Sequence, residues 1–216
     1  MKKIAIIISG CGVFDGAEIH ETVLTMLHIE QLGAQYQCFA PDLAQHHVIN
    51  HINGEEQQES RNVLIEAARI ARGDIHDLAT LNISDFDALV VPGGFGVAKN
   101  LSDFAFNGAD SKILDTFKET CQNFSAQKKP IAYLCIAPAL IGHIHPSGTV
   151  ATIGNDINTA KAAEALGIKH VPCSATDIVV DSEHKVISTP AYMLANSISE
   201  ASNGIAKAIQ QLIDMT

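Results

Sequence analysis

Residues 130–141 read PIAYLCIAPALI, and this stretch does most to decide the fold. The apolar run Ile131–Leu134 has the composition of a buried strand, and residues 136–141 can begin a helix directly after it. Cys135 is the one residue between the two. A strand that turns directly into a helix leaves this side chain on a tight turn, beside backbone N–H groups that have no partner within the helix.

This position makes Cys135 a candidate nucleophile. The free N–H groups and the helix dipole favour the thiolate, which is the reactive form of cysteine. The alternative is a buried cysteine that packs as a small apolar side chain.

Outward from this stretch, short β-rich runs alternate with helical patterns along the whole chain. Such alternation is typical of a largely parallel sheet with helices on both faces, and no linker divides residues 1–216 into two domains. The expected strands are Lys3–Ile8, Tyr36–Phe39, Asp87–Val91, Pro130–Cys135, Thr149–Ile153, His170–Pro172, Ile178–Val180 and Lys185–Ser188. The expected helices are Glu18–Leu32, Arg61–Arg72, Ser111–Gln127, Asp156–Leu166 and Tyr192–Ile213.

One insertion interrupts this alternation. Val48–Ile52 and Glu55–Glu59 flank the pair Asn53-Gly54, which suits a tight hairpin turn, so we expect a small β-hairpin here.

Charge and cysteine content narrow the possible partners and compartments. The chain has 14 basic and 24 acidic residues, and no basic cluster is longer than Lys128-Lys129, which argues against nucleic acid or an anionic membrane as partner. The five cysteines are scattered without a C-x-x-C pair, so we predict a reducing, cytoplasmic location. The five apolar residues Ile4–Ile8 are fewer than the roughly 7–15 of an export signal, and we interpret them as a buried strand.

The ten histidines give no strong metal signal. His46, His47 and His51 surround the hairpin, and His143 and His145 share a short loop, in both cases without a pattern of ligand spacing. We therefore expect no bound metal and no cofactor.

Three sequence features fall at the carboxyl ends of the expected strands, where ligands of doubly wound sheets bind. They are the segment Gly10–Glu21, the turn Pro92–Gly96 and Cys135. In the turn, Gly93 and Gly94 let backbone N–H groups approach a substrate. With the N–H of Ile136 they could form an oxyanion hole, although a plain tight turn needs glycines equally.

Two carboxylates stand at the start of the first expected helix. Acidic side chains such as Glu18 and Glu21 interact favourably with the helix dipole at this end, whether or not they have a catalytic role. If one of them is buried in the cleft, its pKa would rise and it could exchange a proton with the thiol or the substrate. The spacing alone does not choose between them.

Five motifs resemble the bacterial ElbB family, in the PfpI/ThiJ-like branch of the class I glutamine-amidotransferase-like superfamily. The likeness spans essentially the whole chain. The motifs are SGCGVFDGAEIHE (residues 9–21), RNVLIEAARI (61–70), VPGGFG (91–96), CIAPA (135–139) and TPAYMLA (189–195).

The resemblance implies a flavodoxin-like three-layer α/β/α sandwich that forms a homodimer, with the cysteine on the turn. It also implies a hydrogen bond from an acidic residue of the first helix to that cysteine, and the spacing to Gly33 favours Glu21 over Glu18. The catalytic pair is then Cys135 and Glu21. The residues expected to bind substrate or an oxyanion are Gly93, Gly94, Ile136 and Glu18.

The chain also departs from its wider superfamily. Many relatives carry a histidine some way after the cysteine, where this chain reads TVATIG (residues 149–154), and the late His-x-Glu of true glutamine amidotransferases is absent. We therefore do not expect a Cys-His-acid triad or ammonia production from glutamine.

The activity that the resemblance implies is a cofactor-free glyoxalase, a lyase of the hydro-lyase type acting on small 2-oxoaldehydes. Cys135 would add to glyoxal, Glu21 would move a proton, and water would release glycolate from a thioester. Three alternatives stay open: a protein or nucleotide deglycase, a non-catalytic redox or stress-binding protein whose Cys135 is oxidised, and an interaction module in isoprenoid metabolism.

Overall fold

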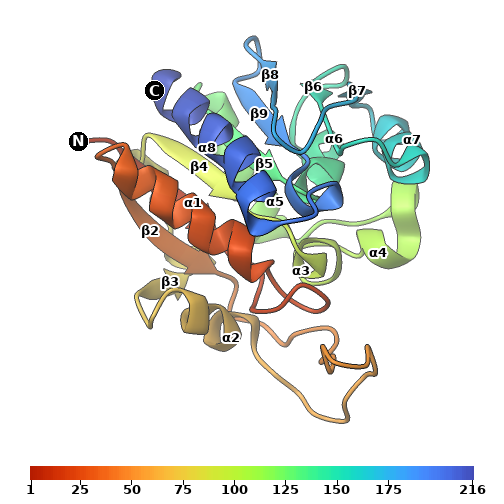
Figure 1. Ribbon diagram of the computed structural model, residues 1–216. Helices are drawn as coiled ribbons and strands as arrows, with labels where there is room; N and C mark the ends of the chain where they lie inside the picture. Colours follow the sequence, from red (N-terminus) through yellow and green to blue (C-terminus); the bar gives the residue numbers. More distant parts are fainter.

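A seven-stranded sheet forms the centre of the computed structural model, which describes residues 1–216 (Figure 1). The strand order is β3-β2-β1-β4-β5-β9-β8, and only β8 runs antiparallel to its neighbour. The strands are β1 (Lys3–Ile7), β2 (Gln35–Ala40), β3 (Ile75–Asp77), β4 (Ala88–Val91), β5 (Ile131–Leu134), β8 (Val179–Asp181) and β9 (Val186–Thr189), with β6 (Val150–Ala151) and β7 (Lys169–His170) paired separately.

Helices cover both faces of this sheet, so the predicted three-layer α/β/α sandwich with a mostly parallel sheet is confirmed (Figure 1). α1 (Ile19–Gln31), α2 (Val63–Ile70) and α8 (Ile198–Asp214) pack on one face. The other face carries α3 (Phe95–Lys99), α4 (Phe104–Asn107), α5 (Asp115–Ala126), α6 (Ile141–Ile144) and α7 (Ile157–Ala165). None of the helices is both long enough and apolar enough to cross a membrane.

The alternation of side chains along each strand divides the core between the two faces. Ile4 and Ile6 of β1 pack toward α1 and α8, whereas Ala5 and Ile7 pack toward α5. Both sets are fully buried, which explains why this strand is a continuous apolar run.

α1 is fixed at both ends by local interactions. The Glu18 side chain caps the helix by accepting the backbone N–H of Glu21 at 2.7 Å. Gly33, with φ of +71°, follows the last turn and ends the helix as expected.

The final helix begins later than the sequence suggested. We expected it from Tyr192, but Ala191–Met193 form a separate 3-10 turn and α8 begins at Ile198, where the Ser197 hydroxyl caps it. Ala191 has φ of +43°, which is incompatible with a continuous α-helix.

Other differences are smaller. α5 begins at Asp115 rather than Ser111, and β3, α3 and α4 were not expected. The hairpin is present as a turn, in which Asn50 donates its N–H to the carbonyl of Glu55 at 2.9 Å, with a single antiparallel bridge between Ile49 and Glu56.

A buried polar pair lies beneath the far face of β5. The Tyr133 hydroxyl is 2.9 Å from His145 Nε2, and both side chains are buried. Burial lowers the pKa of His145 from its ordinary 6.5 to about 4.

This shift predicts acid sensitivity. Between pH 6.5 and 4 the unfolded chain binds a proton at this histidine that the folded protein does not, so the free energy of unfolding should fall by about 3 kcal/mol. In His145→Gln, urea unfolding followed by circular dichroism should show a shallower loss of stability over this range. The half-buried His28→Gln is the control, and equal pH slopes in wild type and His145→Gln would refute the assignment.

Candidate active site

Cys135 lies on the turn between β5 and the 3-10 helix Ala137–Leu140, as the sequence indicated. Its φ is +59°, a left-handed conformation that is strained for a residue with a side chain. Its N–H donates to the carbonyl of Thr189 at 3.0 Å, which extends the pairing of β5 with β9 and holds the turn in place.

Glu21 is the acidic partner of this cysteine. It is fully buried in the first turn of α1, and its carboxyl group accepts a hydrogen bond from the Cys135 thiol. Oε2 also accepts the N–H of Gly93 at 2.9 Å, and Oε1 accepts the N–H of Tyr192 at 3.1 Å. Both carboxyl oxygens are therefore fixed by backbone groups from distant segments.

Two further backbone groups reach the sulfur. The N–H groups of Gly94 and Ile136 both donate to Cys135 Sγ. Gly93 is spatially constrained as well, because a Cβ at this position would lie 2.8 Å from Sγ and 2.7 Å from Glu21 Oε2. The glycine turn is thus required for the close approach of thiol and carboxyl.

The electrostatics of the site reverse one expectation. We predicted an acidified thiol, but burial and the neighbouring Glu21 raise the pKa of Cys135 well above its ordinary value, and the two N–H donors lower it by less. Burial likewise raises the pKa of Glu21 to about 7. Because the two groups titrate together, the pair retains at least one proton at neutral pH.

The residues predicted to bind substrate or an oxyanion do not all reach the thiol. Gly94 and Ile136 direct their N–H groups at the sulfur, whereas the N–H of Gly93 is already used by Glu21. Glu18 caps α1 and donates its own N–H to the Gly93 carbonyl at 2.9 Å, so it supports the turn without touching the thiol.

A cavity of about 340 Å³ opens in front of Cys135. No charged side chain lines it. Val13 and Phe95, from the two segments that the sequence placed at this edge, form part of its wall. The sequence reasoning missed Phe104, Thr159, Tyr192 and Met193, although TPAYMLA contains the last two.

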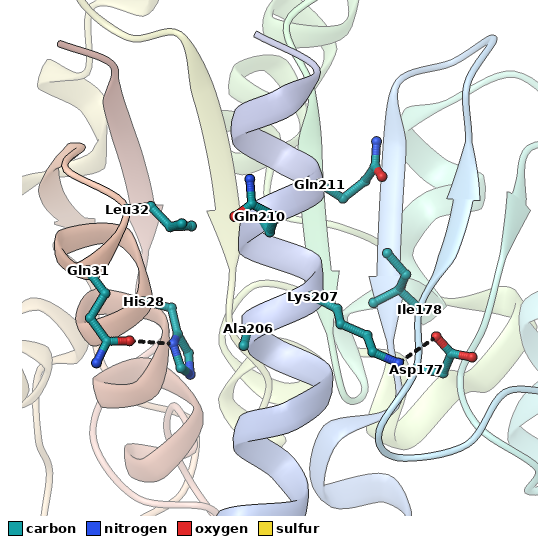
Figure 2. A pocket seen from close by; sticks show the side chains of 9 residues that line it. All are labelled: His28, Gln31, Leu32, Asp177, Ile178, Ala206, Lys207, Gln210 and Gln211. Carbon is teal, nitrogen blue, oxygen red and sulfur yellow. Dashed lines mark hydrogen bonds and ion pairs between the residues drawn. The ribbon is translucent and has the colours of Figure 1, made fainter.

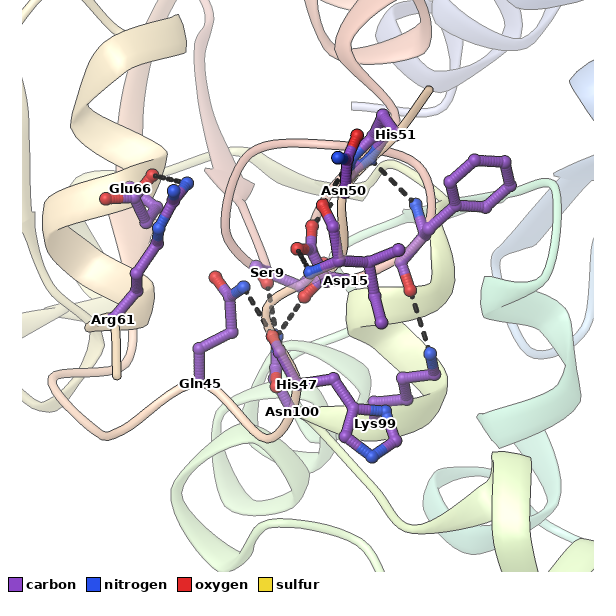
Figure 3. A network of polar contacts seen from close by, with 12 residues as sticks. Ser9, Asp15, Gln45, His47, Asn50, His51, Arg61, Glu66, Lys99 and Asn100 are labelled. Atoms are coloured by element: carbon purple, nitrogen blue, oxygen red, sulfur yellow. Dashed lines mark hydrogen bonds and ion pairs between the residues drawn. The ribbon is translucent and has the colours of Figure 1, made fainter. Parts of the chain in front are cut away.

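Figure 3 shows the polar contacts that anchor the loop before α1. Asn100 Nδ2 donates to the carbonyls of Ser9 and Asp15, at 2.9 Å each, and Asp15 Oδ2 accepts the N–H of Ile49 at 2.7 Å. Because Val13 belongs to this loop, the network fixes one wall of the cavity.

A larger groove lies elsewhere, along α1, α8 and the segment before β8 (Figure 2). It is open, most of its lining residues are polar, and Lys207 pairs with Asp177 in its lining at 3.2 Å. It contains no cysteine, and we do not assign the chemistry to it. Nowhere do three or more His, Cys, Asp or Glu side chains converge in a way that could hold a metal ion.

Removing the carboxylate should lower the pKa of Cys135. In Glu21→Gln the negative charge that raises this pKa is lost, so the pKa of Cys135 should fall toward its ordinary value. The rate of iodoacetamide alkylation at Cys135, followed against pH by mass spectrometry, measures it. Glu30→Gln, on an exposed part of α1, should leave the profile unchanged, and an unchanged profile in Glu21→Gln would show that the two groups are not coupled.

Comparison with curated proteins relates nearly the whole chain to proteins of rat and human, although no family model matches it. The chain is 42% identical over 224 residues to the ES1 protein homolog, mitochondrial, of Rattus norvegicus, covering 99% of this chain and 84% of the relative. It is 41% identical to the glutamine amidotransferase-like class 1 domain-containing protein 3, mitochondrial, of Homo sapiens, covering 99% and 83%.

Solved structures agree with this relationship. An isoprenoid biosynthesis protein with an amidotransferase-like domain from Ehrlichia chaffeensis superposes with a TM-score of 0.94 at 37% identity, over 100% of this chain and 99% of the other. A ThiJ/PfpI domain protein from Brachyspira murdochii shares the fold, with a TM-score of 0.62 at 10% identity over 100% and 98% of the chains. These names do not include ElbB, so membership of that family in particular stays a prediction.

The comparisons correct the predicted compartment. The two curated relatives are named as mitochondrial proteins, and so is an ES1 protein of Danio rerio that is 35% identical, which contradicts the cytoplasmic location inferred from the cysteines. Unpaired cysteines indicate a reducing environment, and this property does not identify one compartment.

Proposed function

Since this chain belongs to the family of the ES1 and glutamine amidotransferase-like class 1 domain proteins, we propose that it is a thiol enzyme acting on small carbonyl compounds. Specifically, we propose a cofactor-free glyoxalase that converts glyoxal to glycolate. The observation that carries this proposal is the Cys135 thiol, which lines the cavity and is hydrogen-bonded to a buried carboxyl group able to exchange its proton.

The lining of the cavity supports an uncharged substrate. It offers no charged side chain, so the ammonium and carboxylate groups of glutamine would be left without partners there. A small 2-oxoaldehyde carries no charge, and its carbonyl oxygen needs only the N–H donors beside the sulfur.

In the first step Glu21 accepts the thiol proton and the sulfur attacks one aldehyde carbon of glyoxal. A carbon–sulfur bond forms as the carbonyl π electrons move to oxygen. The N–H groups of Gly94 and Ile136 stand beside the sulfur, where they would stabilise this negative oxygen. Return of the proton from Glu21 to that oxygen gives a hemithioacetal.

In the second step the hydrogen on the hemithioacetal carbon leaves as a proton and a proton is added to the neighbouring carbon, while the hydroxyl proton of the first carbon moves to the oxygen of the second. One carbon is oxidised and the other reduced, so no external oxidant is needed, and the product is a thioester of glycolate on Cys135. Water then cleaves the carbon–sulfur bond, which releases glycolate and restores the thiol.

Replacing the nucleophile tests the proposal. Cys135→Ser and Cys135→Ala should form glycolate from glyoxal at least about 100-fold more slowly, measured by proton NMR, because the hemithioacetal cannot form. Cys173→Ser, a half-buried cysteine outside the cavity, is the matched control. Full activity in Cys135→Ser would end this mechanism, and rates that track the concentration of a buffer amine would indicate a deglycase instead.

We also propose that the protein is a homodimer. α1 exposes Ile19, Val23 and Leu27, which lie on one helical stripe and are each more than 40% accessible. A second copy covering this stripe would remove the apolar surface from water.

The homodimer predicts a charge-sensitive interface. Val23→Glu would place a carboxylate in the apolar contact and should shift the protein to monomer in light scattering after size exclusion, whereas Glu30→Gln should not. A wild-type protein that is monomeric at micromolar concentration would contradict the proposal.

A further inference from the structure

The proposed reaction moves protons at two places, the sulfur and the substrate carbons, and the geometry of Glu21 suits only the first. Its carboxyl oxygens are held by the N–H groups of Gly93 and Tyr192, and its remaining contact is with the Cys135 thiol. The side chain is fully buried and does not line the cavity. Glu21 is therefore placed to exchange the proton of the thiol, and another group is needed to move the proton of the substrate carbon.

Besides the thiol, two side chains in the cavity lining carry a polar hydrogen. The hydroxyl of Thr159 donates to Asp156 Oδ1 at 2.6 Å, where it belongs to the cap of α7. The hydroxyl of Tyr192 lies 3.0 Å from His20 Nδ1. Tyr192 thus connects the cavity to an imidazole, whereas Thr159 is committed to a structural bond.

The helix explains how His20 reaches this position. His20 and Glu21 are consecutive in α1, so their side chains point in directions about 100° apart. Glu21 enters the protein toward the sulfur, while His20 stays half exposed and meets the Tyr192 ring, with centroids 5.7 Å apart. Glu18 Oε1 lies 4.0 Å from His20 Nδ1, on the same side.

We propose that Tyr192 and His20 move the proton of the carbon-to-carbon shift, an inference that rests on the proposed glyoxalase function. The Tyr192 oxygen takes the proton from the hemithioacetal carbon as its own proton passes to His20. The electron pair of the broken carbon–hydrogen bond forms an enediolate with the adjacent carbonyl. The hydroxyl proton of the first carbon moves to the oxygen of the second carbon, and return of the proton through Tyr192 to the second carbon then gives the thioester and restores both side chains.

In this arrangement Tyr192 is the catalytic residue, because it lines the cavity, and His20 is the positioning residue that holds the proton behind it. His20 of α1 would thereby take the place of the histidine that many relatives carry after the cysteine and that this chain lacks. Tyr192 also links the group that takes the thiol proton to the group that takes the carbon proton, since its backbone N–H binds Glu21 and its hydroxyl binds His20.

Tyr192→Phe and His20→Gln test the relay separately from the thiol chemistry. The first variant removes the hydroxyl but keeps the ring and the backbone N–H that binds Glu21. Both should form glycolate about 100-fold more slowly. Deuterated glyoxal should then give a larger kinetic isotope effect than in wild type, because the carbon–hydrogen step becomes limiting.

Hemithioacetal formation is measured independently, as the protection of Cys135 by glyoxal against iodoacetamide, and both variants should retain it. His28→Gln is the control, since this histidine of the same helix bonds Gln31 and Ser202 instead. An unchanged glycolate rate in Tyr192→Phe would overturn the relay, and an unchanged rate in His20→Gln alone would overturn the part assigned to the histidine. If glyoxal failed to protect Cys135 in the wild type, the proposed function itself would fail.

Discussion

The hydrogen bond between the Glu21 carboxyl and the Cys135 thiol is the constraint on which the rest of the site depends. Burying a carboxyl group costs free energy unless its oxygens accept hydrogen bonds. Here the backbone N–H groups of Gly93 and Tyr192 donate those hydrogen bonds. These partners bring α1, the turn after β4 and the turn after β9 to one point. The same closeness leaves no room for a side chain at Gly93.

Sheet order explains why these segments meet. β1, β4, β5 and β9 are consecutive neighbours, so the turns that leave their carboxyl ends lie side by side at one edge. The strained backbone of Cys135 is held within this group of turns by its bond to Thr189. The cavity then opens toward α3, α4 and α7, on the other face of the sheet from α1.

The site combines a protonated, buried pair with an apolar cavity, and this combination favours uncharged carbonyl substrates over charged amides. Its raised pKa values mean that the thiol does not stand as a permanently exposed thiolate. The sulfur instead becomes reactive when Glu21 accepts the thiol proton while a substrate is bound beside it. In the proposed mechanism Glu21 transfers the thiol proton, whereas Tyr192 and His20 transfer the proton of the substrate carbon.

The sequence by itself determined the parts that local pattern controls: the apolar strands, the turn at Cys135, the glycine turn at residue 93 and an acidic first turn in α1. Without the family resemblance it could not choose Glu21 over Glu18, it gave the wrong direction for the thiol pKa shift, and it did not identify Tyr192, Phe104 and Thr159 as cavity walls. Those properties are set by burial and by contacts between distant segments, such as the bond from Tyr192 to Glu21 across 171 positions. Periodicity and propensity describe neighbours along the chain, whereas desolvation and charge coupling depend on which segments the tertiary structure brings together.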